Sequence, residues 1–355
     1  MRLMHVVDSL EYGGLERVVT DLAIEQKRQG HEVIVFSLQS TEGLAPELKR
    51  AGVEVAIGHK RGTADLRMLR HMRRLMRERR IELVHCHNFV PNYHAAAATL
   101  LMPGRPVIVG TCHDMGMRLS NDRLRRLFRW SLTRTAGLAM VGQQVHDHFV
   151  GEGYVTANRA LTVLNGTPLE RFANSPERRA AGRAALGVAD DELLIGAVGR
   201  LVGLKNHRLL IEQMPAVIER FPRARLMIVG GGPLQDELAA LITELGLSAK
   251  VSLLGQRSDV ALLSAGFDVF AMPSLTEGLS IALLEAWATH LAIVTTAVGG
   301  NPEIVHDGET GLLVPPADGP ALLAALIRML GDAPLRARLA DQAYQWVVAN
   351  ASVDK

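Results

Sequence analysis

A turn from a strand into a helix is encoded by Pro273-Ser-Leu-Thr-Glu277-Gly278-Leu-Ser280-Ile-Ala-Leu-Leu-Glu285-Ala-Trp-Ala288. The apolar run 268–273 has the composition of a buried strand, and from about Leu279 the apolar residues recur with helical spacing. A glycine just before a helix allows close backbone approach, and the unpaired N–H groups of the first helical turn favour an anion. The turn is therefore a candidate phosphate site.

Glu277 and Glu285 stand on either side of the expected helix start. If the interval between them is mostly helical, it separates them by about 12 Å, beyond the ~5–9.5 Å between the carboxylates of a glycoside hydrolase. We interpret them as holding the two ends of one elongated ligand, with a phosphate between them. A sugar nucleotide has that layout. The alternative is that both are solvated acids, the commoner state of a glutamate.

The composition indicates a large globular protein rather than a nucleic-acid or disulfide-stabilised one. The chain has 355 residues, 48% of them hydrophobic, which favours two domains. A formal charge of +2 does not call for nucleic acid, and the two cysteines, Cys86 and Cys112, fit a reducing cytosol. The N-terminal apolar run is too short for a signal peptide and no run reaches the length of a membrane span. We expect a cytoplasmic protein that can still contact a membrane surface.

Strand-like apolar runs alternate with helical patterns along the chain, which is typical of parallel βαβ units with a buried sheet. In the first half, strands are expected at 2–7, 33–38, 53–57, 81–87, 107–111, 138–141 and 161–164. In the second half, they are expected at 193–198, 226–229, 251–254, 269–272, 292–295 and 311–314. The predicted fold class is α/β, with two doubly wound, Rossmann-like domains.

These domains are predicted at 1–166 and 193–334. A connector rich in charge, alanine and proline joins them at 167–192, and a helical segment follows at 335–355. In doubly wound sheets, ligands bind outside the carboxyl ends of the strands. Two such sheets that face each other predict a ligand cleft between the domains.

Glycine occurs in three strand-to-helix turns, Gly13-Gly14, Gly199-Arg200 and Gly230-Gly-Gly-Pro233. None completes the dinucleotide pattern G-x-G-x-x-G, since Gln235 stands at its last position, and no Walker motif is present. Arg200 can hold a phosphate with two bonds, and Lys205 adds a point charge in the same turn. With the helix start after Glu277 they predict a diphosphate clamp that needs no metal. The alternative is a pair of exposed surface cations.

Together these features resemble the retaining GT-B glycosyltransferases of the glycosyltransferase family 4 type, over nearly the whole chain and in the expected order. The matching motifs are Gly13-Gly14-Leu-Glu-Arg, Thr111-Cys-His113-Asp, Gly199-Arg200 to Lys205-Asn206-His, Gly230-Gly-Gly-Pro, Glu277-Gly278 to Glu285-Ala, and Gly299-Gly300-Asn-Pro-Glu303-Ile-Val. The two glutamates beside Arg200 and Lys205 are the specific part of the likeness, since glycine turns alone are common.

The resemblance implies a role for each matching residue. Arg200 and Lys205 would bind the donor diphosphate, Glu285 the ribose hydroxyls and Glu277 the hydroxyls of the transferred sugar, while His113 would face that sugar. The rest of the donor pocket would comprise Gly14, Gly278, Leu279, Ser280, Gly300 and Glu303. Family mechanism implies front-face transfer with retention, in which the leaving phosphate helps to take the acceptor's proton. No cofactor and no metal is then expected beyond the nucleotide sugar as co-substrate.

The end of the chain departs from the family pattern. Members usually carry a last helix that returns to the first domain, whereas the helical pattern 335–348 stops shortly before Lys355. We expect a shortened or brief return helix. Pro168 also stands where an aspartate usually follows Asn165-Gly166, and Gly203 loosens the Arg200–Lys205 loop.

Two further features suggest additional ligands. His85-Cys86-His87 and Cys112-His113-Asp114 invite a zinc hypothesis, but alternate strand residues face opposite sides, so Cys86 points away from its two neighbours and metal binding is not expected. Two helical segments, 67–80 and 123–134, are strongly arginine-rich. They are either solvated faces or a surface that docks onto an anionic lipid leaflet.

The sequence thus predicts transfer of a sugar from a UDP- or GDP-sugar to a glycan or lipid-linked acceptor, in envelope or exopolysaccharide biosynthesis. The expected location is the cytoplasm, with peripheral contact at the inner face of the plasma membrane, and nucleic acid is not an expected partner. Two alternatives stay open: a non-hydrolysing sugar-nucleotide epimerase, and a catalytically silent sugar-nucleotide-binding scaffold.

Overall fold

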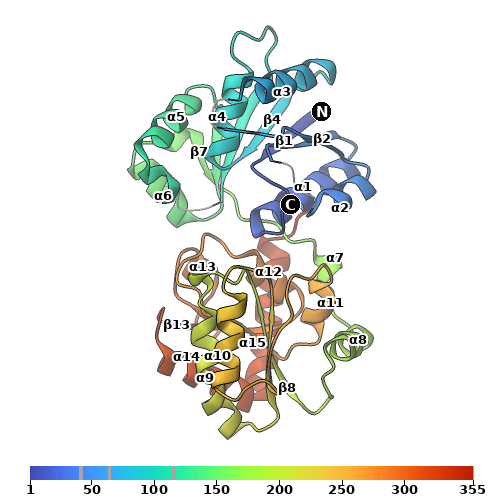
Figure 1. Cartoon of the computed structure of the whole chain (residues 1–355), viewed down its shortest axis with the longest axis vertical. Helices are drawn as coiled ribbons and strands as arrows, with labels where there is room; N and C mark the ends of the chain where they lie inside the picture. Colours follow the sequence, from blue (N-terminus) through green and yellow to red (C-terminus); the bar gives the residue numbers. More distant parts are fainter. Residues whose placement is uncertain (40–42, 63–64, 114–116, 355) are drawn as a thin grey trace. The chain divides into compact units, whose positions relative to one another are not determined.

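A computed structural model of the chain describes residues 1–39, 43–62, 65–113 and 117–354 (Figure 1). The chain divides into two compact units, Met1–Gly166 and Thr167–Val353. Each is a parallel sheet with helices on both faces, and each is described by itself below. The predicted cleft between the domains stays a prediction.

The first unit is built on a seven-stranded parallel sheet in the order β3-β2-β1-β4-β5-β6-β7. Its strands are β1 (Arg2–Val7), β2 (Glu32–Ser37), β3 (Glu54–Ile57), β4 (Leu83–His87), β5 (Val107–Cys112), β6 (Gly137–Met140) and β7 (Ala160–Thr162). Every strand predicted in this half is present, with its ends displaced by at most two residues. The order reverses between β1 and β4, the place where ligands bind in open parallel sheets.

Helices of the first unit cover both faces of its sheet. They are α1 (Gly14–Arg28), α2 (Ala45–Arg50), α3 (Leu66–Glu78), α4 (Phe89–Ala98), α5 (Asp122–Leu132) and α6 (Gln143–Gly151). Because strand side chains alternate in direction, Met4 and Val6 share a core with α3, α4 and α5, whereas Leu3 and Val7 share a core with α1 and α2. His5 lies between Leu3 and Val7 and faces α1.

The second unit has a six-stranded parallel sheet in the order β10-β9-β8-β11-β12-β13. Its strands are β8 (Leu193–Val198), β9 (Ala224–Val229), β10 (Val251–Leu253), β11 (Val269–Met272), β12 (Ala292–Thr296) and β13 (Leu312–Val314). Its helices are α7 (Leu169–Phe172), α8 (Pro176–Leu186), α9 (His207–Arg220), α10 (Gln235–Glu244), α11 (Val260–Ala265), α12 (Ile281–Ala288), α13 (Asn301–Ile304), α14 (Gly319–Gly331) and α15 (Ala333–Asn350). The predicted strands of this half are present within the same margin.

The segment 167–192, suggested as a connector, packs as part of the second unit. Its buried Arg183 donates hydrogen bonds to the carbonyl oxygens of Gly266 at 3.1 Å and Glu192 at 2.7 Å, and pairs with Asp268 at 3.3 Å. Burying an arginine is costly unless its charge is paired and its guanidinium donates hydrogen bonds. These bonds fix α8 beside the start of β11.

One part of the sequence interpretation is wrong in its premise. The helix α12 begins at Ile281, so only the second half of the interval from Glu277 to Glu285 is helical, and the 12 Å estimate for a mostly helical interval does not apply. The reason is that residues 274–280 form a loop held by partners from other strand ends, which are described below.

The C-terminal helix α15 packs against α12, β12 and α14 of its own unit. Trp346 on α15 meets the buried Trp287 on α12 edge-on, with ring centroids 5.2 Å apart. A return of this helix to the first domain stays a prediction. Within the described residues, we find no helix whose length and apolar character would suit it to crossing a bilayer.

Candidate functional site

Lys205 and Glu277 meet at the carboxyl ends of the neighbouring strands β8 and β11. Lys205 closes a short 3-10 turn after β8, and its Nζ lies 2.5 Å from Oε1 of Glu277. The hydroxyl of Ser274 donates to the same carboxylate oxygen at 2.6 Å. The Glu277 side chain is only 8% exposed, so both charges are largely removed from water. The structure thus brings together two of the four residues expected to bind the diphosphate and the hydroxyls of a nucleotide sugar, which are Arg200, Lys205, Glu277 and Glu285.

Backbone contacts between the loops explain why these side chains meet. The N–H of Leu275 donates to the carbonyl of Leu204 at 2.8 Å, which ties the loop after β11 to the turn after β8. The carbonyl of Ser274 accepts a hydrogen bond from the Thr296 hydroxyl at 2.6 Å, which ties the same loop to the end of β12. The loop that carries Glu277 is therefore fixed from both neighbouring strands.

The Gly299-Gly300 turn supports the Glu277 loop from a third side. The N–H of Gly300 donates to the carbonyl of Gly278 at 2.7 Å. Gly299 has a φ of +53°, and a Cβ there would lie 1.8 Å from the carbonyl oxygen of Glu277. Any side chain at this position would both strain the backbone and displace the glutamate. The Gly299-Gly300 motif thus positions Glu277.

A similar close approach joins the ends of β8 and β9. Gly230 has a φ of +146°, and a Cβ there would lie 1.9 Å from the carbonyl oxygen of Gly199. The N–H of Leu201 donates to the carbonyl of Gly231 at 2.9 Å. The turn that carries Arg200 and Lys205 therefore rests on the glycine turn of the next strand.

The remaining predicted residues of the second unit lie on the turns that follow these strands or on the helices after the turns. Arg200 is exposed just after β8, Leu279 and Ser280 are buried before α12, Glu285 lies on α12 and Glu303 on α13. Ser280 is the N-cap residue of α12, and its carbonyl accepts from the Leu284 N–H at 3.4 Å. The roles of Glu285 and Glu303 in donor binding stay predictions.

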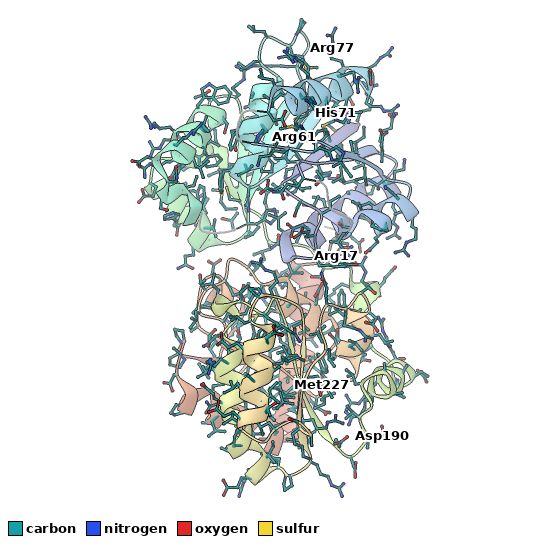
Figure 2. The ribbon with its side chains drawn as sticks, in the orientation of Figure 1. Arg17, Arg61, His71, Arg77, Asp190 and Met227 are labelled. Carbon is teal, nitrogen blue, oxygen red and sulfur yellow. The ribbon has the colours of Figure 1, made fainter. Side chains whose placement is uncertain are left out.

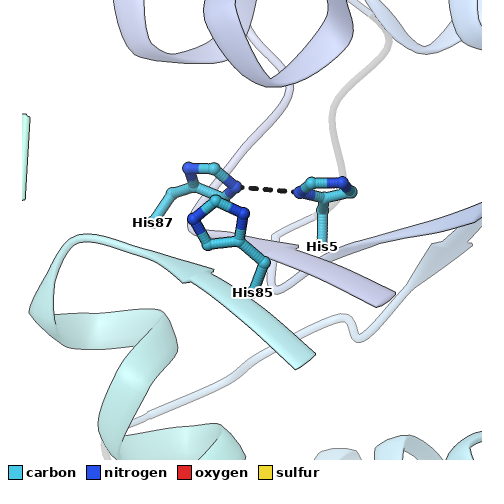
Figure 3. Close-up of side chains that lie close together, drawn as sticks. All are labelled: His5, His85 and His87. Atoms are coloured by element: carbon cyan, nitrogen blue, oxygen red, sulfur yellow. Dashed lines mark hydrogen bonds between the residues drawn. The ribbon is translucent and has the colours of Figure 1, made fainter. Parts of the chain in front are cut away.

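In the first unit, the structure places His113 at the end of a row of buried histidines. Its Nε2 lies 3.1 Å from Nδ1 of His87, whose Nε2 lies 3.0 Å from Nδ1 of His5 (Figure 3). Nε2 of His5 lies 2.7 Å from Oε1 of Gln26 on α1. His85 packs beside this row, with its ring centroid 4.3 Å from that of His87, and its Nε2 lies 2.7 Å from the Thr111 hydroxyl. The other predicted residue of this unit, Gly14, is the first residue of α1.

Sequence reasoning missed His5 and Gln26. In the sheet His5 stands opposite His85 in parallel register, and His85 and His87 share that face of β4. The pairing of β1 with β4 could have revealed His5, because it brings together histidines that lie on the same face of the two strands.

Burial keeps these imidazoles neutral. It lowers the pKa of His5 and His113 to about 4, and lowers the pKa of His85 and His87 well below the ordinary value. Each ring therefore carries one N–H donor and one lone-pair acceptor at neutral pH.

The histidine row also bears on the zinc hypothesis. Cys86 lies in the core on the other face of the sheet, as its alternation with His85 and His87 predicts, and Asp114 lies outside the described residues. His5, His85 and His87 do offer nitrogens within 4.8 Å of one another. The distance between the His5 and His87 nitrogens also fits a hydrogen bond between the two rings. The expectation of no metal therefore stays a prediction.

Comparison with known proteins places this architecture in a family. The sequence model of the family described as glycosyltransferase family 4 matches residues 12–171, and that of the glycosyl transferases group 1 matches residues 179–346. EpsF of Bacillus subtilis (strain 168) is 29% identical over 302 residues, which cover 82% of this chain and 78% of that protein.

Two further likenesses concern proteins associated with uridine nucleotides. An Escherichia coli UDP-Gal:alpha-D-GlcNAc-diphosphoundecaprenol alpha-1,3-galactosyltransferase is 27% identical over 276 residues, covering 76% of this chain and 71% of its own. The crystal structure of Anabaena Alr3699/HepE in complex with UDP and glucose has a TM-score of 0.87 and 22% identity, covering 99% of this chain and 96% of its own. This structural likeness confirms the predicted GT-B fold. The chain therefore belongs to the GT-B glycosyltransferases of the glycosyltransferase family 4 type.

Proposed function

We propose that this glycosyltransferase moves a sugar from a UDP- or GDP-sugar to a glycan or lipid-linked acceptor, with retention of anomeric configuration and without a metal. The observation that carries the proposal is the Lys205–Glu277 pair at the ends of β8 and β11. The pair places a cation, which can bind the diphosphate, beside a carboxylate, which can bind sugar hydroxyls. In a nucleotide sugar the diphosphate and the sugar are likewise adjacent.

Within this proposal each charged group has a distinct task. Lys205 and Arg200 offset the charge of the donor diphosphate, together with the backbone N–H groups of Gly278 to Ser280 at the start of α12. Glu277 accepts hydrogen bonds from hydroxyls of the transferred sugar, and Glu285 from those of the ribose. Donor binding redirects Lys205 from Glu277 toward phosphate, which frees carboxylate lone pairs for the sugar.

The proposed reaction takes place on one face of the sugar. The bond from the anomeric carbon to the diphosphate oxygen breaks, and the bond to the acceptor oxygen forms on the same face. The acceptor's proton passes to the departing phosphate oxygen, so no protein nucleophile is needed. The cations stabilise the charge that develops on the leaving group, usually the largest single contribution to such catalysis.

Product analysis tests the proposal directly. The purified chain is incubated with UDP- and GDP-sugars, with and without extracts of glycan or undecaprenyl-linked acceptors, and the products are separated. We expect nucleoside diphosphate to be released in proportion to acceptor extension, with an alpha linkage from an alpha-linked donor. A new sugar epimer would instead support the epimerase, and binding without turnover would support the silent scaffold. Membership of the family favours transfer over both.

A lipid-linked acceptor would require a membrane-facing surface, and α3 and α5 offer one. A groove of about 480 Å³ between α3, α4 and α5 is lined by the apolar Leu69, Leu127 and Trp130 and by the cations Arg123 and Arg126. Trp130 is 38% exposed, and both arginines are exposed. Apolar groups flanked by cations are suited to an anionic bilayer surface.

The arginines of α3 extend this basic surface. Arg67, Arg70, Arg74 and Arg77 are all exposed on the helix, and Arg77 is labelled in Figure 2. An anionic leaflet attracts each such cation by about 1 kcal/mol near its surface. We accordingly propose that the protein lies on the cytoplasmic side of the plasma membrane, where α3 and α5 hold it peripherally.

Liposome flotation provides the measurement for this surface. The protein should float with vesicles that contain phosphatidylglycerol and should remain in the bottom fraction with phosphatidylcholine alone. Replacing Arg123 and Arg126 with glutamate should abolish flotation. The matched control replaces the exposed Lys49 and Arg50 of α2 with glutamate, which changes the charge equally in the same unit. Equal recovery with both kinds of vesicle, or equal loss in both variants, would remove the membrane surface from the proposal.

A further inference from the structure

Four side chains of the first unit form one continuous row from α1 to the end of β5. Gln26 Oε1 lies 2.7 Å from His5 Nε2, His5 Nδ1 lies 3.0 Å from His87 Nε2, and His87 Nδ1 lies 3.1 Å from His113 Nε2. His5 and His87 are 0% and 1% exposed, so water does not interrupt the row. Figure 3 shows how the rings of His5 and His87 meet through their nitrogens.

Neutral imidazoles in such a row cannot choose their tautomers independently. Each ring has one donor and one acceptor, and an amide oxygen can only accept. Because Gln26 presents Oε1, His5 donates through Nε2 and must accept at Nδ1. His87 then donates through Nε2 to His5 and accepts at Nδ1 from His113. His113 therefore carries its proton on Nε2 and has a lone pair on Nδ1.

The backbone at the end of the row is fixed as well. The N–H of His113 donates to Oδ1 of Asn88 at 2.8 Å, and the N–H of Asn88 donates to the carbonyl of Thr111 at 2.7 Å. Asn88 adopts a φ of 66°, an uncommon conformation for a residue with a side chain. Ring position and proton position of His113 are thus set by different partners.

We propose that Gln26 is a positioning residue that sets the tautomer of His113 through His5 and His87, so that Nδ1 of His113 accepts a hydrogen bond from a donor-sugar hydroxyl. The sugar contact rests on the proposed function, whereas the tautomer does not. An acceptor at this position selects a hydroxyl and disfavours a sugar that presents only an acceptor there, because two lone pairs would then oppose each other. The row only orders protons and transfers none.

The tautomer is measured directly by long-range ¹H–¹⁵N NMR on protein labelled with ¹⁵N-histidine, with signals assigned from single histidine variants. We expect the wild type and Gln26→Glu, which keeps an acceptor, to show His113 protonated at Nε2. Gln26→Met removes the acceptor and should give His113 a mixture of both tautomers. Thr111→Val is the matched control, because it removes the partner of His85 and leaves the row intact.

Kinetics then test the sugar contact. Gln26→Met should lower kcat/KM for transfer about tenfold, Gln26→Glu should restore most of it, and thermal unfolding should show both variants folded. His113 protonated at Nδ1 in the wild type, or an unchanged tautomer in Gln26→Met, would overturn the proposal. Absence of transferase activity would leave the NMR outcome intact and would count against the proposed function alone.

Discussion

Replacing Lys205 with alanine is expected to lower kcat/KM for sugar transfer by about 10²–10³-fold, the loss typical of removing one group that stabilises developing charge. Lys205 ends the turn after β8 and reaches Glu277 at 2.5 Å. Its charge would meet the diphosphate as the bond to the anomeric carbon breaks. Because the diphosphate is more negative in the transition state than in the bound donor, kcat should fall more than the donor's KM rises.

The same substitution has a separate effect on stability. It leaves the carboxylate of Glu277, 8% exposed, with the Ser274 hydroxyl but without its cation. Leaving a buried charge unpaired is destabilising, so Lys205→Ala should unfold at lower urea concentration than the double variant Lys205→Ala, Glu277→Gln. Activity of the double variant should remain low, which separates a catalytic loss from a folding loss.

A surface cation on the following helix supplies the control. Arg208 pairs with Glu237 at 2.7 Å and Glu212 at 3.4 Å, and its side chain is 44% exposed. Exposed pairs contribute about 0–1 kcal/mol, so Arg208→Ala should leave both kcat/KM and the urea midpoint nearly unchanged. If Lys205→Ala keeps kcat/KM within twofold of the wild type, the proposed diphosphate clamp is wrong.

The sheets could be predicted because their signal is local. Parallel strands buried on both faces appear as short apolar runs between glycine-rich turns, and β8 and β11 begin and end where these runs predict. The pair Lys205 and Glu277 followed from the same logic, since residues just after the carboxyl ends of parallel strands converge at one edge.

Features that depend on contacts between distant segments could not be predicted. The loop before α12 departs from helical geometry because Leu275 and Gly278 bond to the turns after β8 and β12. Nothing within the sequence of the loop itself specifies those partners. The sequence therefore predicts a helix start two residues before the observed Ile281, and only the last part of the interval from Glu277 to Glu285 is helical.

The histidine row shows the same limit more clearly. His85 and His87 stand two residues apart in sequence, and the pairing of β4 with β5 brings His87 to His113, one of the residues in the segment compared with them. His5 joins them only through the register that sets it opposite His85, and Gln26 through the packing of α1 on that face. A prediction of strand order would have found the first of these partners, but the second needs the helix placed in three dimensions.

Acid should unfold the first unit through its buried histidines. Burial lowers the pKa of His5, His94 and His113 to about 4, and the pKa of His87 falls well below the ordinary value. In the unfolded chain these groups titrate near pH 6.5. Between pH 6.5 and pH 4 the unfolded state therefore binds more protons than the folded state, so the free energy of unfolding falls as the pH is lowered. Above pH 6.5 both states are neutral and this contribution is complete.

The expected fall in the free energy of unfolding between pH 7 and pH 5 is large for a protein of ordinary stability. A histidine that stays neutral when folded costs about 2 kcal/mol at pH 5. Three such groups, His5, His94 and His113, would remove much of the ~5–15 kcal/mol that typically holds a protein folded. Urea unfolding at pH 7, 6 and 5, followed by circular dichroism, should show a midpoint that falls steeply with an unchanged m-value. Carboxylates contribute little in this window because their ordinary pKa values lie below it.

Two single variants distinguish the histidines from a general acid effect. His94→Gln removes a buried imidazole whose Nδ1 bonds to the Val90 carbonyl at 2.8 Å, and should reduce the proton uptake on unfolding by about one between pH 6 and 5. His306→Gln is the matched control, because it removes an exposed imidazole of the second unit. A urea midpoint that stays constant from pH 7 to 5 would mean that the buried imidazoles are protonated in the folded chain. The neutral row through His5 and His87 would then be wrong.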